Sequence, residues 1–359
     1  MFGNVAHKNR LHATKMMQYN DLDARTIRER IDMAQLWDAW IEADDLRRHS
    51  FRGSIGWEAR NGRDYLYSRK RGVVKSLGPR SPETEQTHAA FHQGREANKS
   101  RLSSLSVEMD RQAAVLRSLN AGRLPLMAAR TLRALRTHDK AATIRVIGTN
   151  ALYAYEAMAG VVFNSESTAT GDVDILVDDR NRLRLLTDAD EQIGLTRLVQ
   201  QEVDKTFQSR GTMDFRLTND KGYMIEFVRP EPTPVYRPMP GADPLETGDI
   251  RPAPIVGLQW LVNAPVVEVI VLDERGFPAP MRCSDPRHWT VHKLWLSTRP
   301  DRDPQKKIRD RQQADVMLRL IAEKLPQFPL DPEFRKMLPR ELAGMLEPGA
   351  SPEPTEPSW

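Results

Sequence analysis

The sequence predicts a protein of the α/β (α+β) class, in which helical segments at both ends flank a region of short strands. Residues 26–50 and 82–120 place apolar side chains three or four positions apart, which is typical of helices. Residues 287–297 and 304–325 have the same character. Between them, the segments "AATIRVIGTN", "DVDILV" and "VVEVIVLDERG" indicate short apolar strands. Strands and helices are therefore expected to mix within one chain.

The first predicted unit, residues 1–120, is a basic, mainly helical accessory module with a β-hairpin near residues 51–80. Asn61 and Gly62 are a strong signal for the turn of this hairpin. Basic and aromatic residues alternate here, which suits a phosphate backbone and unstacked bases. The alternative is a solvated strand face with aromatic rings packed beneath it. The candidate nucleic-acid-binding residues are Arg60, Arg63, Tyr65, Tyr67, Arg69, Lys70, Arg71 and Lys75.

The remaining units are expected at residues 121–232, 233–346 and 347–359. The first of these opens with a helix, since Pro125 suits a first helical turn. It continues through a strand, the helix "ALYAYEAMAG", the strand "DVDILV" and a second hairpin that turns at "NDKG". Residues 233–346 contain one apolar strand and two helices, and the Pro-rich acidic tail is predicted to be disordered.

Composition describes an ordinary globular chain of 359 residues, with 40% apolar and 28% charged residues. A single cysteine, Cys283, excludes an internal disulfide framework and fits a reducing compartment. No apolar run approaches the length of a membrane span, and the N-terminus lacks the apolar core of a signal peptide. We therefore expect a cytoplasmic protein without membrane contact.

The net charge of +4 hides an asymmetry between the two parts of the chain. Residues 1–140 carry 26 basic and 16 acidic residues, and the remainder carries 27 basic and 33 acidic residues. Such a division suggests that one part meets a polyanion while the other holds metal or catalytic acids. Two differently solvated surfaces would give the same division.

Several common chemistries lack their signatures. The chain has no P-loop, no Rossmann glycine motif, no H-E-x-x-H, no paired C-x-x-C and no G-x-S-x-G. A calcium loop starting at Asp172 would place Val177 where glycine is needed and Leu183 where the bidentate glutamate belongs. His88 and His92 have helical i, i+4 spacing but lack a third ligand, so they are expected to be surface or packing residues.

Two acids in the strand "DVDILV" are the best candidates for a reactive site. Strand side chains alternate between faces, so Asp172 and Asp174 lie side by side while Val173 points away. Carboxylates held that close need compensation, and Mg²⁺ favours such oxygen ligands together with water and substrate phosphates. A neighbouring strand, "GYMIEFV", supplies Glu226 as a third acid, and Asp214 is the competing candidate.

The strand before this pair ends in "VIGTN". Gly148 allows a phosphate to approach the backbone, and Thr149 adds a hydroxyl donor. Asn150 follows at the start of a helix, whose N-terminus offers free N–H groups and a positive dipole. Alone, this segment would be an ordinary strand–helix turn; ahead of the acid pair, it becomes a candidate seat for a nucleoside triphosphate.

These segments together resemble the DNA polymerase β-like nucleotidyltransferase superfamily. The matching stretches are "IGTNALYAYEAMAGV", "TATGDVDILVDD", "NDKGYMIEFVRP" and "HWTVHKLWLSTRPDRDPQKKIRDRQQADVM". They cover about residues 124–325 and are most similar to bacterial proteins near the abortive-infection nucleotidyltransferase toxins. The resemblance implies a nucleotidyltransferase-fold mixed sheet with flanking helices, and a helical C-terminal domain that completes the nucleotide cleft.

The resemblance also implies roles for individual residues. Asp172 and Asp174 would hold Mg²⁺ or Mn²⁺, and Glu226 would be the third catalytic acid and metal ligand. Gly148, Thr149 and Asn150 would seat the nucleotide, while Lys293, with Lys307 as a second candidate, would reach a phosphate. Asp310 is expected to pair with a nearby arginine. Many members have Gly-Ser or Gly-Gly at positions 148 and 149 and an aspartate at position 226, so the longer Glu226 shifts the third carboxylate outward.

Three functions compete at this stage. In the first, an NTP donates a nucleoside monophosphate to an RNA hydroxyl, in tRNA for example, in a toxin or defence role with a regulatory or antitoxin protein as partner. The second acceptor class is a small molecule or a protein hydroxyl. The third function is non-catalytic nucleotide binding in a regulatory protein. The first is favoured by the basic hairpin and by a further cluster: Arg123, Arg130, Arg133 and Arg136.

Overall fold

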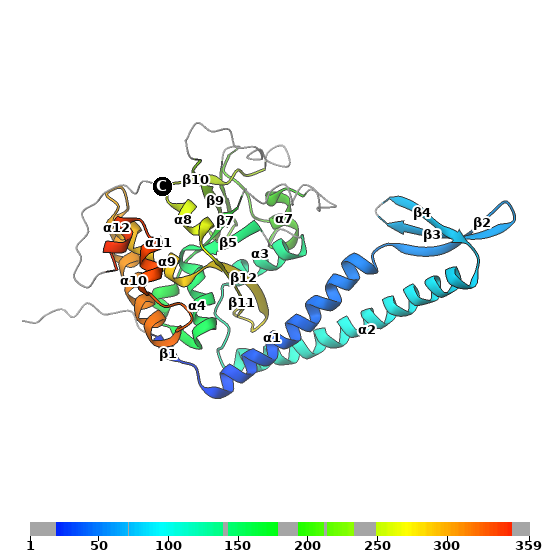
Figure 1. Cartoon of the computed structure of the whole chain (residues 1–359), viewed down its shortest axis with the longest axis horizontal. Helices are drawn as coiled ribbons and strands as arrows, with labels where there is room; N and C mark the ends of the chain where they lie inside the picture. Colours follow the sequence, from blue (N-terminus) through cyan, green and yellow to red (C-terminus); the bar gives the residue numbers. More distant parts are fainter. Residues whose placement is uncertain are drawn as a thin grey trace, which may run out of the picture.

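The computed structural model describes residues 19–70, 72–138, 143–178, 193–211, 214–232 and 249–346, and the structural statements below refer to these residues. A body that contains the main sheet carries a long projecting arm (Figure 1). The candidate hairpin residue Arg71 and the tail 347–359 lie outside the described residues. Among the residues described, no helix combines the length and apolar character needed to cross a membrane.

The body is built around a mixed seven-stranded sheet, which confirms the predicted α+β class. The strand order is β10-β9-β7-β5-β12-β11. The short strand β8 lies off this path and pairs with the first three residues of β9. The pairs β7–β9, β9–β10 and β5–β12 are parallel, whereas β5–β7, β8–β9 and β11–β12 are antiparallel. The strands are β5 (Ile144–Ile147), β7 (Asp172–Val177), β8 (Arg216–Thr218), β9 (Met224–Pro230), β10 (Ala253–Ile255), β11 (Val266–Leu272) and β12 (Pro278–Ser284).

Helices cover this sheet and close the core. The largest buried cluster joins residues of β5, β7 and β9 to α3 (Leu126–Thr137) and α4 (Ala151–Ala159). As expected, α3 begins directly after Pro125. The same core includes residues of α7 (Leu195–Glu202). Two smaller elements, α5 (Ser165–Thr168) and β6 (Val161–Phe163), link α4 to β7, and β6 pairs with β1 (Tyr19–Asp21).

The C-terminal helices pack at one end of the body. The helix α9 (Pro286–Thr298) follows β12 directly, with Asp285 as its N-cap and proline at the first helical position. It packs against α10 (Pro304–Lys324), whose N-cap is Asp303. Three short helices complete this end: α8 (Leu258–Asn263), α11 (Pro332–Met337) and α12 (Arg340–Gly344).

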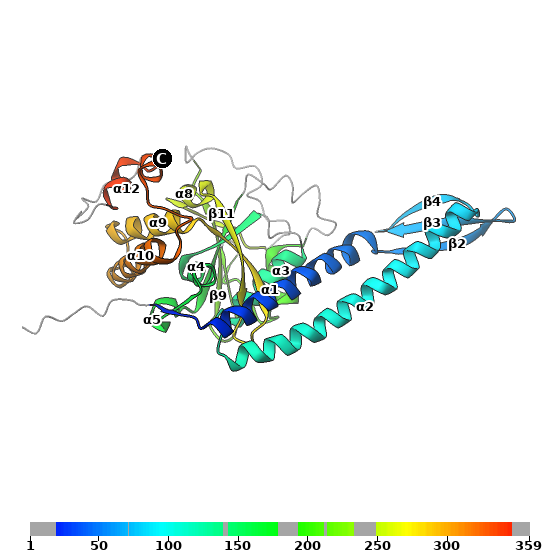
Figure 2. The ribbon, with the colours of Figure 1, turned by 60° about the horizontal axis from the view of Figure 1, so that its bottom comes forward.

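The projecting arm consists of two antiparallel helices and a small sheet (Figure 2). The helices α1 (Ala24–Asp45) and α2 (Pro82–Ser118) pack through Met33, Trp37 and Met109 near the body. A π-helical turn, Leu46–Ser50, leads from α1 into the sheet. The sheet contains β2 (Ser54–Arg60), β3 (Arg63–Lys70) and β4 (Val73–Pro79) in that order.

This small sheet corrects the expected hairpin near residues 51–80. The first turn is as predicted, with Asn61 at φ 52° and Gly62 at φ 74°, as the favoured two-residue hairpin turns require. A third strand, β4, then pairs with β3. The chain reverses a second time beside Gly72, whose φ of 74° is readily adopted only without a side chain.

The strand β12 was not predicted from the sequence, because Pro278 and Pro280 interrupt the residue pattern of a strand. Proline cannot donate to a sheet ladder. In the structure β12 pairs along its whole length with the edge strand β11, but with β5 only at Cys283. The strands β10, β11 and β12 follow residue 233, where a domain boundary was expected, and they belong to the same sheet as the strands that precede it.

Candidate active site

The acid pair lies on β7, on the side of the strand that faces a cavity. Val173 and Ile175 point the other way and are fully buried in the main core. That core fixes the orientation of the strand and therefore holds Asp172 and Asp174 on the cavity side. The Thr170 hydroxyl donates to the Asp172 carboxylate, which restricts its rotation.

Glu226 stands beside this pair, as the two parallel strands dictate. The register of β7 and β9 sets Asp174 directly opposite Glu226. The Glu226 carboxylate contacts Arg216 of β8 at 3.0 Å. Among the described residues, no three His, Cys, Asp or Glu side chains form a group that could hold a metal ion. The structure thus makes Glu226 a neighbour of the aspartates and pairs it with an arginine.

Gly148 is required by close approach and by backbone conformation. It follows β5, whose last residue, Ile147, lies opposite Asp174. A Cβ atom at position 148 would lie 2.0 Å from Oδ2 of Asp174, and the residue has a φ of 61°. Only glycine fits this position without moving the acid or straining the backbone.

The residues after Gly148 fix the turn against the acids. Asn150 is fully buried, and its Nδ2 donates to the Asp172 carbonyl at 2.7 Å. The Thr149 hydroxyl is 3.3 Å from Nε2 of Gln313 on α10. Trp289 on α9 donates to the Gly148 carbonyl at 3.0 Å. Strand β5, strand β7 and both C-terminal helices therefore meet at this turn.

The three acids carry like charges that repel one another. Burial, with the nearby Asp172 and Glu226 carboxylates, raises the pKa of Asp174 to about 7. Burial also raises the pKa of Glu226, an effect that Arg216 opposes. The site therefore contains negative charge that the protein compensates only in part. Hard carboxylate oxygens with excess negative charge suit a divalent cation such as Mg²⁺.

Lys293 on α9 supplies a buried positive charge to the lining of the cavity. Burial lowers its pKa, while Asp310, 2.7 Å from its Nζ, acts in the opposite direction. Asp310 also accepts from Nε of Arg302 at 2.9 Å. The carboxylate thus holds Lys293 and Arg302 together at the cavity, in agreement with its expected pairing with an arginine.

The cavity enclosed by these groups has a volume of about 440 Å³. Some of the lining residues are basic and include Arg302, Lys306 and Arg309, none of which was predicted from the sequence. Lys306 lines the cavity, whereas Lys307 is not among the described lining residues. Another part is apolar: Val228, Ile255, Val256, Leu258 and Leu296. A cavity with acids, cations and an apolar wall can accommodate metal, phosphates and a base.

A family comparison is consistent with this geometry. A nucleotidyltransferase family model matches residues 127–339, more than half of the chain. The chain belongs to this nucleotidyltransferase family. It is therefore a nucleotidyltransferase enzyme with a nucleoside triphosphate as substrate, and enzymes of this kind generally use divalent metal ions. No curated protein and no solved structure matches the chain. The matched residues include the acids, the Gly148 turn and Lys293.

The seven candidate nucleic-acid residues that the structure describes lie far from the cavity, on the small sheet of the arm (Figures 1 and 2). The strand register divides them between its two faces. Leu66 and Trp57 lie opposite each other, and Trp57 contacts His88 of α2, so their face covers the helix. Lys70 lies on this same helix-facing side, and so does Lys75, which pairs with Ser68. Lys70 also donates to the His49 carbonyl. The outward face carries the remaining five: Arg60, Arg63, Tyr65, Tyr67 and Arg69.

The second arginine cluster, expected to favour RNA, is engaged in contacts within the protein. Arg123 pairs with Glu156, and Arg133 pairs with Asp273 at 2.7 Å. Arg130 donates to the Val203 carbonyl, and Arg136 pairs with two aspartates of α1. This expectation was therefore wrong for these four residues. A sequence alone does not reveal that acids distant along the chain meet such arginines.

Proposed function

We propose that the enzyme transfers a nucleoside monophosphate from an NTP to a hydroxyl group of RNA, in a reaction that depends on Mg²⁺ or Mn²⁺. The observation that carries this proposal is the cavity that Asp172, Asp174 and Lys293 line together. Placement in the DNA polymerase β-like superfamily, near the abortive-infection toxins, and a toxin or defence role belong to the same proposal.

The acids would hold the cation, and the basic wall would hold the phosphates. Asp172 and Asp174 fit a metal because their negative charge is only partly compensated. Bound there, the ion would stabilise negative charge on the phosphate oxygens. Lys293, with Lys306 and Arg309, would orient the triphosphate. Gly148 allows the Asp174 carboxylate to approach the turn beside the phosphates, and the apolar lining residues would receive the base.

In the proposed reaction, the acceptor oxygen forms a bond to the α-phosphorus while the bond to the leaving pyrophosphate breaks. The hydroxyl proton passes to a carboxylate of the site. Glu226 is the proposed acceptor of this proton, since Arg216 holds its carboxylate beside Asp174. Its predicted role as a third metal ligand would require it to leave Arg216. Positioning of the two reactants contributes much of the rate in phosphoryl-transfer enzymes.

RNA is the proposed acceptor because of the outward face of the arm sheet. This face carries three arginines and Tyr65, and the Arg60 guanidinium covers the buried ring of Tyr67, 4.8 Å from its centre. Arg60 and Arg69 also pair with Glu58 on the same face. Arginine and aromatic side chains together suit phosphates and unstacked bases. A small molecule or a protein hydroxyl remains the second candidate acceptor, since the catalytic residues would be the same.

The test supplies the purified protein with each α-labelled NTP, a divalent ion and total cellular RNA. The proposal predicts that label enters RNA, and that chelation of the ion or replacement of both aspartates by alanine abolishes this transfer. Label in protein or in small molecules alone would support the second candidate. No labelling by the intact protein would contradict both and would favour a nucleotide-binding regulatory role.

A further inference from the structure

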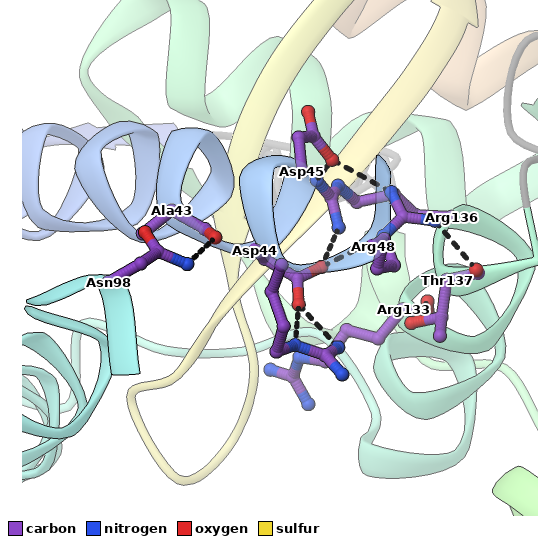
Figure 3. Close-up of polar contacts among 9 residues, drawn as sticks. Ala43, Asp44, Asp45, Arg48, Asn98, Arg133, Arg136 and Thr137 are labelled. Atoms are coloured by element: carbon purple, nitrogen blue, oxygen red, sulfur yellow. Dashed lines mark hydrogen bonds and ion pairs between the residues drawn. The ribbon is translucent and has the colours of Figure 1, made fainter. Parts of the chain in front are cut away.

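The arm is joined to the body near the C-terminal end of α1 (Figure 3). The small sheet β2–β4 lies beyond this point (Figures 1 and 2). Asp44 is almost completely buried, with 1% of its surface exposed. Arg136 of α3 donates to Asp44 at 3.1 Å and to Asp45 at 2.9 Å. Arg48 donates to Asp45 and also to the Thr137 carbonyl at the end of α3. We call these five residues the joint; they link the arm to the catalytic body through charged hydrogen bonds.

The same position is braced from the other helix of the arm. Asn98 of α2 is buried and donates to the Ala43 carbonyl at 2.9 Å, next to Asp44 (Figure 3). From this point residues 82–98 of α2 continue away from the body, a length of about 25 Å at the helical rise per residue. The small sheet β2–β4, which we call the tip, therefore stands tens of Å from the joint (Figures 1 and 2).

Positive charge is concentrated at the tip and does not run along the arm. Residues 51–80 contain eight basic and two acidic residues, whereas α2 contains five of each. Polyanion binding is driven by such local positive charge. The arm thus offers one basic end, and the catalytic cavity in the body carries lysine and arginine side chains in its lining beside the acids. The other helix of the arm, α1, is acidic, with three basic and six acidic residues.

We propose that the acceptor is a folded RNA that is bound at two separate points, with its reactive end at the cavity and its backbone on the outward face of the tip. This inference rests on the proposed RNA-directed activity. The joint holds the cavity and the tip at a fixed separation. The arm therefore selects acceptors that are long enough to reach from one to the other. A short acceptor that fills only the cavity cannot reach the tip.

The experiment compares two acceptors that share one reactive end: a full-length tRNA and a short hairpin with the same 3′-terminal sequence. The tip variant is Arg60→Gln/Arg63→Gln/Arg69→Gln. The control variant, Arg25→Gln/Arg28→Gln/Arg117→Gln, removes the same charge from exposed positions at the body end of the arm. Thermal unfolding of each variant verifies that it is folded, and an Arg→Lys version of the tip variant retains the charge.

We expect the tip variant to raise KM for the long acceptor by about tenfold or more and to weaken its salt dependence. The short hairpin should be labelled by the tip variant as it is by the parent. The control variant should resemble the parent with both acceptors, and the Arg→Lys version should recover part of the loss. An equal effect on both acceptors, or none on the long one, would overturn the two-point proposal alone. Absence of RNA labelling by the parent would overturn the proposed function with it.

Discussion

Replacement of Gly148 by alanine tests whether the turn after β5 sets the position of Asp174, a proposed catalytic acid. The new Cβ atom would lie 2.0 Å from Oδ2 of Asp174, so the carboxylate must retreat by roughly 1 Å or more to reach van der Waals contact. A displacement of that size at a reacting centre can reduce the rate by about 100-fold. The positive φ of residue 148 adds about 1–2 kcal/mol of backbone strain.

Two other glycines separate these effects. Gly222 has a φ of 80° but open space around its Cβ position, so Gly222→Ala introduces the strain without the clash. Gly171 has open space and no positive φ, so Gly171→Ala should change little. Urea denaturation should rank the losses of unfolding free energy as Gly148→Ala, then Gly222→Ala, then Gly171→Ala.

The activity assay is transfer from α-labelled NTP, measured on the same three variants. Only Gly148→Ala should lose transfer by about 100-fold, because only this change moves Asp174. A Gly148→Ala enzyme with the parental rate would refute the reasoning. The same conclusion would follow if Gly222→Ala lost as much activity, since strain alone would then account for the effect.

Two further variants test the cavity wall and the joint. Asp310→Asn should lower the pKa of Lys293 further, because Asp310 opposes the effect of burial. As the pH rises, the variant should therefore lose affinity for NTP at a lower pH than the parent does. The measurement is KM for NTP as a function of pH, and identical curves for variant and parent would contradict this prediction. Asp44→Ala should lower the unfolding free energy by about 3 kcal/mol, since it leaves the Arg136 charge partly uncompensated. Arg47→Ala removes the exposed partner of the same carboxylate and should cost less than about 1 kcal/mol. Equal losses of unfolding free energy for the two variants in urea denaturation would contradict a larger contribution from the buried Asp44–Arg136 pair.

The sequence predicted those parts of the fold that depend on local pattern. Alternation in "DVDILV" placed Val173 in the core and the acids on the opposite face, and the structure agrees. The hairpin that turns at "NDKG" is present as β8 and β9. Both long C-terminal helices begin at a proline preceded by an aspartate N-cap, a signal within the sequence itself.

Features that depend on distant contacts were not predictable in this way. The sequence cannot show that Arg136 meets Asp44, because the two residues are far apart along the chain and join only when α1 packs on α3. The pattern of β12 was hidden by its prolines. Lys306 and Lys307 are neighbours, and only the orientation of α10 determines which of them lines the cavity.

The central claim is that Asp172 and Asp174 perform nucleotidyl transfer, and the most direct measurement replaces both by asparagine, which keeps their shape and removes their charge. In chelator at pH 8, Asp172→Asn/Asp174→Asn should unfold at a higher urea concentration than the parent. The reason is that burial and like charge raise the pKa of Asp174 to about 7, so its ionised form opposes folding above that pH. With divalent metal, the same variant should transfer no label from any α-labelled NTP while the parent does. A stable variant that transfers label at the parental rate would contradict the account.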